Sequence, residues 1–186
     1  LKFINYRFDS MDNKQTILWK TYLDKHKDRM LEELTDILKI PSVSADPAYA
    51  NEVFSMAKDL ENRLSKIGLE EVRAYETDGF PMVYGQKTID PRLPTVLVYG
   101  HYDVQPADPL ELWTSPPFEP VIRDEKIYAR GACDDKGQMY LQIKAIEVLI
   151  QTETLPCNVK VLIEGEEEVG SSNLEDFVKA NTSLLS

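Results

Sequence analysis

The sequence predicts an α/β fold, a three-layer α/β/α sandwich around a mostly parallel sheet. Runs of β-branched residues alternate along the chain with segments whose apolar residues recur at helical spacing. The two most apolar runs, at residues 95–100 and 158–163, each lead into glycine and polar side chains, as strands of such sheets do. The 186 residues, 42% of them hydrophobic, are enough for one domain with its own core.

Two helices are expected in the first third of the chain. The apolar face of the first consists of Trp19, Leu23, Met30, Leu34, Ile37 and Leu38. This helix must end before Pro41, because a proline restricts the residue that precedes it. The second begins at Asp46 and Pro47, a cap followed by a first-turn proline, and ends at Gly68. Its inward face is expected to consist of Phe54, Ala57, Leu60, Leu64 and Ile67.

Strands are predicted at residues 71–75 and 82–87, followed by a strand at 95–100 that is buried on both faces. Residues 121–122 and 127–128 are expected to pair as a hairpin across the polar segment between them.

In the last third of the chain, the sequence predicts a helix, a strand and a second helix. The helix covers residues 136–151, with its apolar residues at helical spacing: Met139, Ile143, Ile146 and Ile150. A core strand follows at residues 158–163. The final helix starts at Asn173 and points three side chains inward: Leu174, Phe177 and Val178.

Composition excludes several classes of protein. The 21 basic residues against 32 acidic ones give a net charge of −11, which repels nucleic acids and anionic membrane surfaces. No run approaches the ~18 consecutive apolar residues of a membrane span. Two cysteines, Cys133 and Cys157, do not make a disulfide framework in a chain of this length. We therefore expect a cytoplasmic protein.

The first residues read differently from the rest. Residue 1 is leucine, and Met11 is followed by an ordinary beginning of a soluble chain. We interpret residues 1–10 as a leader or upstream segment, and residues 11–186 as one domain.

Three polar clusters, at residues 100–103, 130–137 and 164–170, follow structural elements. Ligands of open α/β sheets collect beyond the carboxyl ends of the strands. We therefore expect His101, either Asp134 or Asp135, and one or two of the glutamates at 166–168 to converge.

One imidazole with several carboxylates suits zinc, manganese or cobalt. Calcium prefers oxygen ligands alone, and an iron–sulfur centre needs more thiolates. Each cluster by itself is more often a solvated loop or a capped strand end. The three together, flanked by glycines, favour a metal site.

The same clusters carry a family resemblance. GHYDVQP at 100–106, RGACDDKGQ at 130–138 and IEGEEEVG at 163–170 resemble the zinc-dependent dipeptidase family. This family includes carnosine-type and cytosolic non-specific dipeptidases, with aminoacylases and succinyl-diaminopimelate desuccinylase as wider relatives. The resemblance implies a catalytic domain that holds two divalent metal ions, zinc foremost with manganese or cobalt as alternatives, and an inserted lid domain.

The resemblance also assigns roles to individual residues. It implies that His101 binds one metal ion, Asp134 bridges both, and Glu168 binds the other. Asp103 would orient the imidazole, and Glu167 would be the general base that activates the water between the metals. A cis peptide bond is implied between Asp134 and the aspartate that follows it.

The resemblance implies that this chain is the N-terminal part of a larger enzyme. In the family, a further carboxylate, a further histidine and the lid follow the position that corresponds to Ser186. His26 does not replace the missing histidine, because it lies on the apolar-face helix as a packing or surface residue. The full-length parent is expected to be a homodimer that hydrolyses dipeptides, and the chain alone is expected to be inactive.

Two alternatives are weaker. Cys133 paired with His101 could act as a nucleophile, but two aspartates follow the thiol and would raise its pKa by repulsion. The other alternative is a non-catalytic metal-binding remnant or partner subunit. A lid and a later histidine-containing segment encoded beyond Ser186 would indicate an enzyme, whereas a stop codon directly after it would indicate the remnant or subunit.

Overall fold

The computed structural model describes residues 13–186, so the interpretation of residues 1–10 lies outside the described range. The helices are α1 (Asn13–Leu38), α2 (Ala50–Lys66), α3 (Lys136–Gln151), α4 (Leu174–Ala180) and α5 (Thr182–Leu185). The strands are β1 (Glu70–Tyr75), β2 (Met82–Lys87), β3 (Thr95–His101), β4 (Val121–Arg123), β5 (Lys126–Tyr128) and β6 (Asn158–Glu164). Short 3-10 turns are η2 (Pro47–Tyr49), η3 (Leu110–Leu112) and η4 (Glu167–Val169).

The main sheet has the strand order β1-β2-β6-β3, and β4 pairs with β5 as the predicted hairpin. Only β3 and β6 run parallel, whereas β1 with β2 and β2 with β6 are antiparallel. The prediction of a mostly parallel sheet was therefore wrong, and the sheet is mixed. The short connection between β1 and β2 leaves no room for a crossover helix, so these strands turn back on each other. The long connection from β3 to β6 contains α3, which permits parallel pairing.

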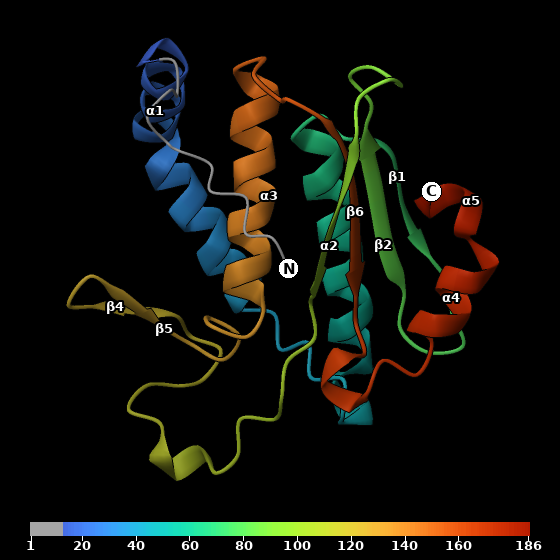
Figure 1. The fold of residues 1–186 in the computed structure, drawn as a ribbon. Helices are drawn as coiled ribbons and strands as arrows, with labels where there is room; N and C mark the ends of the chain where they lie inside the picture. Colours follow the sequence, from blue (N-terminus) through green and yellow to red (C-terminus); the bar gives the residue numbers. More distant parts are fainter. Residues whose placement is uncertain (1–12) are drawn as a thin grey trace, which may run out of the picture.

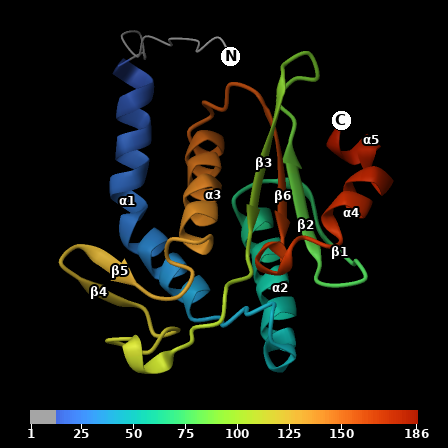
Figure 2. The ribbon, with the colours of Figure 1, turned by 60° about the horizontal axis from the view of Figure 1, so that its bottom comes forward.

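The α/β class and the three layers are confirmed (Figure 1). Helices α2 and α3 cover one face of the sheet, while α4 and α5 lie on the other (Figure 2). The larger core cluster joins α2 and α3 to the sheet through fully buried side chains that include Leu60, Leu64 and Ile143. The smaller cluster joins α4 to the opposite face through Met82, Leu162 and Phe177.

Three side chains predicted to face the core are exposed. Phe54 is 49% exposed and packs only edge-on against the ring of Phe80, because Val53 and Met56 take the inward positions of α2. Leu23 and Val178 are 42% and 37% exposed. The apolar stripe of a helix is broad, so helical spacing alone does not fix which of its edge positions the neighbouring layer covers.

Strand β3 is not buried on both faces as predicted, because it is the edge strand of the described sheet and has β6 as its neighbour there. Val96, Leu97 and Tyr99 are 47%, 46% and 43% exposed. Its carboxyl end is covered, however, and His101 is buried. The part of β3 that positions the metal cluster is thus its most enclosed part.

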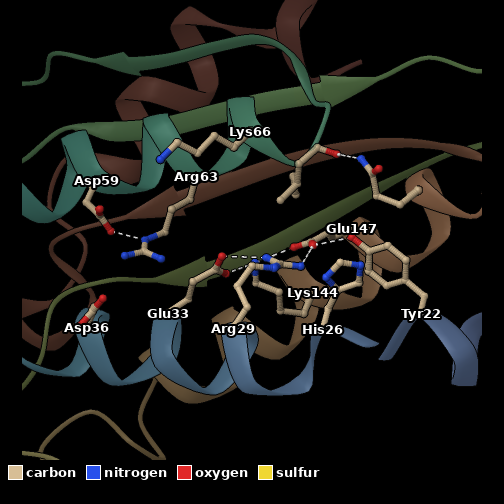
Figure 3. A pocket seen from close by; sticks show the side chains of 12 residues that line it. Tyr22, His26, Arg29, Glu33, Asp36, Asp59, Arg63, Lys66, Lys144 and Glu147 are labelled. Carbon is tan, nitrogen blue, oxygen red and sulfur yellow. Dashed lines mark hydrogen bonds and ion pairs between the residues drawn. The ribbon is translucent and has the colours of Figure 1, made fainter. Parts of the chain in front are cut away.

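Mostly charged side chains line a cavity of about 480 Å³ between α1, α2 and α3 (Figure 3). Arg29 on α1 contacts Glu33 at 2.7 Å and Glu147 on α3 at 2.5 Å. Lys144 contacts the same two carboxylates at 2.5 and 2.6 Å, and Tyr22 donates a hydrogen bond to Glu147. Both carboxylates are satisfied within this network, so it fastens α1 to α3.

None of the helices within residues 13–186 has the combination of length and apolar character that crossing a bilayer requires.

Candidate metal centre

The structure brings His101, Asp134 and Glu168 together, with one ligand atom of each within 4.8 Å of the others. His101 ends β3, and its register partner Glu164 ends β6, because these two strands run parallel. The turn η4 follows β6 directly and carries Glu168 to the same edge of the sheet. Asp134 approaches from the loop before α3, where its peptide bond to Asp135 is cis, as the resemblance implies.

His101 lies between two carboxylates. Its Nδ1 is 3.2 Å from Oδ1 of Asp103, and its Nε2 is 3.2 Å from Oδ1 of Asp134. Asp103 is fully buried, whereas the side chain of Asp134 is 70% exposed. The buried contact fixes the imidazole ring from behind, so that Nε2 faces the open side of the cluster.

The electrostatics of the cluster favour a cation. Burial by itself lowers the pKa of His101, but the hydrogen bond and charge of Asp103, with the charges of Asp135 and Glu167, outweigh it and raise the pKa to about 9. The imidazole therefore lies in a field of surplus negative charge. One nitrogen and two oxygen donors with that charge fit a divalent ion such as zinc or manganese.

Asp103 also holds the turn that carries Glu168. The backbone N–H groups of Glu167 and Glu168 donate to its carboxylate at 3.3 and 3.1 Å, and the hydroxyl of Ser44 donates at 2.6 Å. These hydrogen bonds tie the loop at Ser44 and the η4 turn to one buried carboxylate.

The neighbouring acidic residues occupy different places. Asp135 accepts a hydrogen bond from the backbone N–H of His101 at 3.1 Å and is not in the cluster. Glu166 is buried and accepts from Asn173 at 2.7 Å. The carboxylate of Glu167 is 44% exposed and 3.7 Å from Nε2 of His101. Of the alternatives left open by the sequence, the structure therefore selects Asp134 over Asp135 and Glu168 over Glu166 as members of the cluster.

Sequence reasoning missed three residues around the centre. Ser44 precedes the motifs by more than 50 positions and gave no signal. Gln105 donates to Oε2 of Glu168 at 2.8 Å, and its place within GHYDVQP could have revealed it. Lys136, between the aspartates and α3, is fully buried and donates to the carbonyl oxygens of Ile37 and Ile40. Burial lowers the pKa of Lys136 to about 7.

The cysteine alternative gains no support from the structure. Cys133 is exposed, and within residues 13–186 both ring nitrogens of His101 face carboxylates rather than a thiol. His26 packs against the ring of Tyr22 at 4.4 Å on α1 and is not among the residues of the cluster.

Comparisons with known proteins agree with these features. Residues 97–184 match the family described as peptidase family M20/M25/M40. The Cys-Gly metallodipeptidase dug1 of Schizosaccharomyces pombe is 36% identical over 169 residues, which cover 85% of this chain and 36% of that protein. This chain therefore spans little more than a third of that relative.

Solved structures give the same result. Human carnosine dipeptidase 1 superposes with a TM-score of 0.82 at 32% identity, over 90% of this chain and 38% of that one. The M20 family metallo-carboxypeptidase Sso-CP2 from Sulfolobus solfataricus superposes with a TM-score of 0.78 at 39% identity, over 84% of this chain and 35% of that one.

Proposed function

Residues 97–184 match peptidase family M20/M25/M40, and on that basis we propose that the chain belongs to this family and carries part of the active site of a metal-dependent hydrolase of dipeptides. The relatives named above are a Cys-Gly metallodipeptidase, a carnosine dipeptidase and a metallo-carboxypeptidase, which supports a peptide amide bond as the target. The observation that carries the proposal is the convergence of His101, Asp134 and Glu168 from three separate segments.

In this proposal His101, Asp134 and Glu168 hold divalent metal, and Asp103 orients the imidazole of His101. Zinc suits the mixture of one nitrogen with carboxylate oxygens, and manganese or cobalt would accept the same donors. The support is the 4.8 Å grouping of the three side chains and the buried contact between Asp103 and Nδ1 of His101.

Glu167 is proposed as the general base. Its carboxylate is beside the cluster without belonging to it, 3.7 Å from Nε2 of His101 and partly open to solvent. A bound divalent ion supplies Lewis acidity, which lowers the pKa of a water molecule and polarises the scissile carbonyl. Glu167 would accept a proton from the attacking water and pass it to the leaving amine, a role that suits a carboxylate outside the set of metal ligands.

We further propose that residues 11–186 form the N-terminal part of the catalytic domain and that the working site holds two ions. Two adjacent ions need more donors than the three side chains of the cluster, so other ligands would come from outside the described residues. On this basis the 186-residue chain alone should show no appreciable dipeptidase activity. We also propose a cytoplasmic homodimer as the working form, and this proposal rests on the family resemblance.

Zinc titration of the chain by calorimetry tests the metal centre. We expect one weakly bound ion per chain, because the set of ligands is incomplete. The double variant His101→Ala/Asp134→Ala should lose this binding. The matched control His26→Ala/Asp36→Ala removes the same residue types from α1 and should bind zinc like the wild type. Identical isotherms for all three proteins would contradict the proposal.

A further inference from the structure

A second cavity, of about 770 Å³, adjoins the metal cluster. It lies between the segment that contains η3 and the β4–β5 hairpin, and its lining extends through Cys133 to Asp134. Asp134 is also a member of the cluster, so the cavity and the cluster share this residue. None of the other residues that line the cavity belongs to the metal cluster.

The cavity is positively charged in a strongly acidic chain. Arg123, Lys126 and Arg130 line it, and Asp134 is its single acidic lining residue. Within residues 13–186, none of the three basic side chains forms an ion pair with a carboxylate. The chain has 32 acidic residues against 21 basic ones, so a basic side chain would ordinarily find a carboxylate nearby. Three neighbouring basic side chains without such a partner are therefore unusual in this chain.

Aromatic rings hold the two guanidinium groups in place. Arg130 lies over Trp113 at 5.5 Å from the ring centroid, and Arg123 lies over Tyr128 at 4.3 Å. The indole N–H of Trp113 donates to the carbonyl oxygen of Ala107 at 2.8 Å, so this ring is itself fixed. Stacking orders an arginine without using its hydrogen-bond donors.

Those donors are largely unused. The Nε atoms of Arg123 and Arg130 are buried and have no hydrogen-bond partner among the described residues. Arg130 donates once, from Nη2 to the carbonyl oxygen of Pro106 at 3.1 Å. Buried donors without acceptors are costly, and these two guanidinium groups therefore keep hydrogen-bonding capacity that the described residues do not use.

We propose that this cavity is a subsite for a carboxylate-bearing part of the peptide substrate. The carboxylate lies among Arg123, Lys126 and Arg130, and the apolar part of the ligand lies against Trp113 and Tyr128. An arginine fork matches the geometry of a carboxylate, and the apolar walls favour an organic acid over an inorganic anion. That the ligand is a peptide rests on the proposed function, whereas the preference for a carboxylate rests on the cavity alone.

Binding of 3-phenylpropionate to the chain, measured by calorimetry, tests the subsite against the neutral analogue 3-phenylpropanol. The acid should bind more tightly, and Arg123→Gln should weaken its binding roughly tenfold, the effect of one lost charge-assisted hydrogen bond. Arg92→Gln is the matched control, because it removes the same charge from an exposed loop and should change nothing. Arg130→Gln is a second variant in case Arg123→Gln does not fold. Equal binding of acid and alcohol, or unchanged binding in both cavity variants, would overturn the proposal.

Three peptides then identify the source of the carboxylate. Tighter binding of glycyl-glutamate amide than of glycyl-glutamine assigns a side-chain carboxylate to the subsite, and the reverse order assigns the C-terminal one. If neither peptide binds better than glycyl-glutamine amide, which has no carboxylate, the subsite is contradicted. Zinc titration separates the two proposals. If the wild-type chain binds phenylpropionate but no zinc, the result supports the subsite and contradicts the proposed metal-dependent hydrolase.

Discussion

The buried carboxylate of Asp103 accepts a hydrogen bond from the backbone N–H of Glu168 at 3.1 Å. The same carboxylate is 3.2 Å from Nδ1 of His101. One side chain between β3 and the following loop therefore fixes both the imidazole and the turn that carries the glutamate. The geometry of the metal cluster depends on a residue that is not itself in it.

Asp103→Asn should weaken zinc binding by the chain about 10- to 100-fold, the usual effect of losing the partner of a metal-binding histidine. The amide has one acceptor oxygen and no charge, so it cannot hold His101 and the η4 turn together. A competition titration with a zinc-binding dye measures the affinity. Asp46→Asn, at the cap of η2, is the control and should bind zinc normally. Unchanged affinity of a folded Asp103→Asn protein would show that the imidazole is positioned by other means.

Glu167 and Glu168 should respond differently to substitution. Glu168→Ala should weaken zinc binding, because this carboxylate lies within the 4.8 Å cluster. Glu167→Gln should leave zinc binding intact, and in the active dipeptidase it should lower turnover by roughly two to four orders of magnitude. Elemental analysis of bound metal, read beside the rate, checks both. If Glu167→Gln loses the metal while Glu168→Ala keeps it, the two roles are exchanged.

The stability of the chain should fall in acid as Glu33 takes up a proton. Burial alone raises the pKa of this carboxyl, but hydrogen bonds from Lys144 and Arg29 outweigh burial and lower the pKa from 4.5 to about 2. Because the folded-state pKa lies below the unfolded one, the stabilisation is complete above pH 4.5 and is lost as the pH falls toward 2.

Urea unfolding at several pH values should therefore show a shallower loss of stability in Glu33→Gln than in the wild type between about pH 4.5 and 2. Glu32→Gln alters the exposed neighbour on α1 and should follow the wild-type curve. Parallel curves for the wild type and Glu33→Gln would mean that the network between α1 and α3 does not depend on this charge.

Gly137→Ala should destabilise the chain and weaken zinc binding. An added Cβ would lie 2.0 Å from the carbonyl oxygen of Ala132, a backbone atom that can move only with the loop that holds Asp134. Overpacking of this kind costs about 1–3 kcal/mol in the free energy of unfolding. Thermal unfolding and zinc titration measure the two effects.

Gly85→Ala is the control for Gly137→Ala, because its new Cβ would meet a methyl group of Val72 at 3.2 Å. It should cost less and leave zinc affinity unchanged. A Gly137→Ala protein as stable as Gly85→Ala would show that the loop can shift without cost.

The sequence predicted most elements because their signals are local. Helix α3 covers the predicted residues 136–151, and β2 covers 82–87. Periodicity could not assign the edge of a helical face, as the exposure of Phe54 shows. Periodicity also could not predict which strands pair, because the antiparallel pair of β2 and β6 joins segments more than 70 residues apart in the sequence.

The sequence by itself determined the α/β class, the resemblance to metallodipeptidases and the three motifs that supply the candidate ligands, since each is written in contiguous residues. The resemblance already assigned metal binding to Asp134 and Glu168, and the tertiary structure decided how the segments that carry them meet, because β3 and β6 run parallel and end at the same edge of the sheet. The tertiary structure groups both carboxylates with His101, and it brings Ser44 from a distant loop to the carboxylate of Asp103. It also placed basic side chains of the β4–β5 hairpin and the loop around Trp113 in the walls of one cavity that reaches Asp134, an arrangement that no local pattern describes.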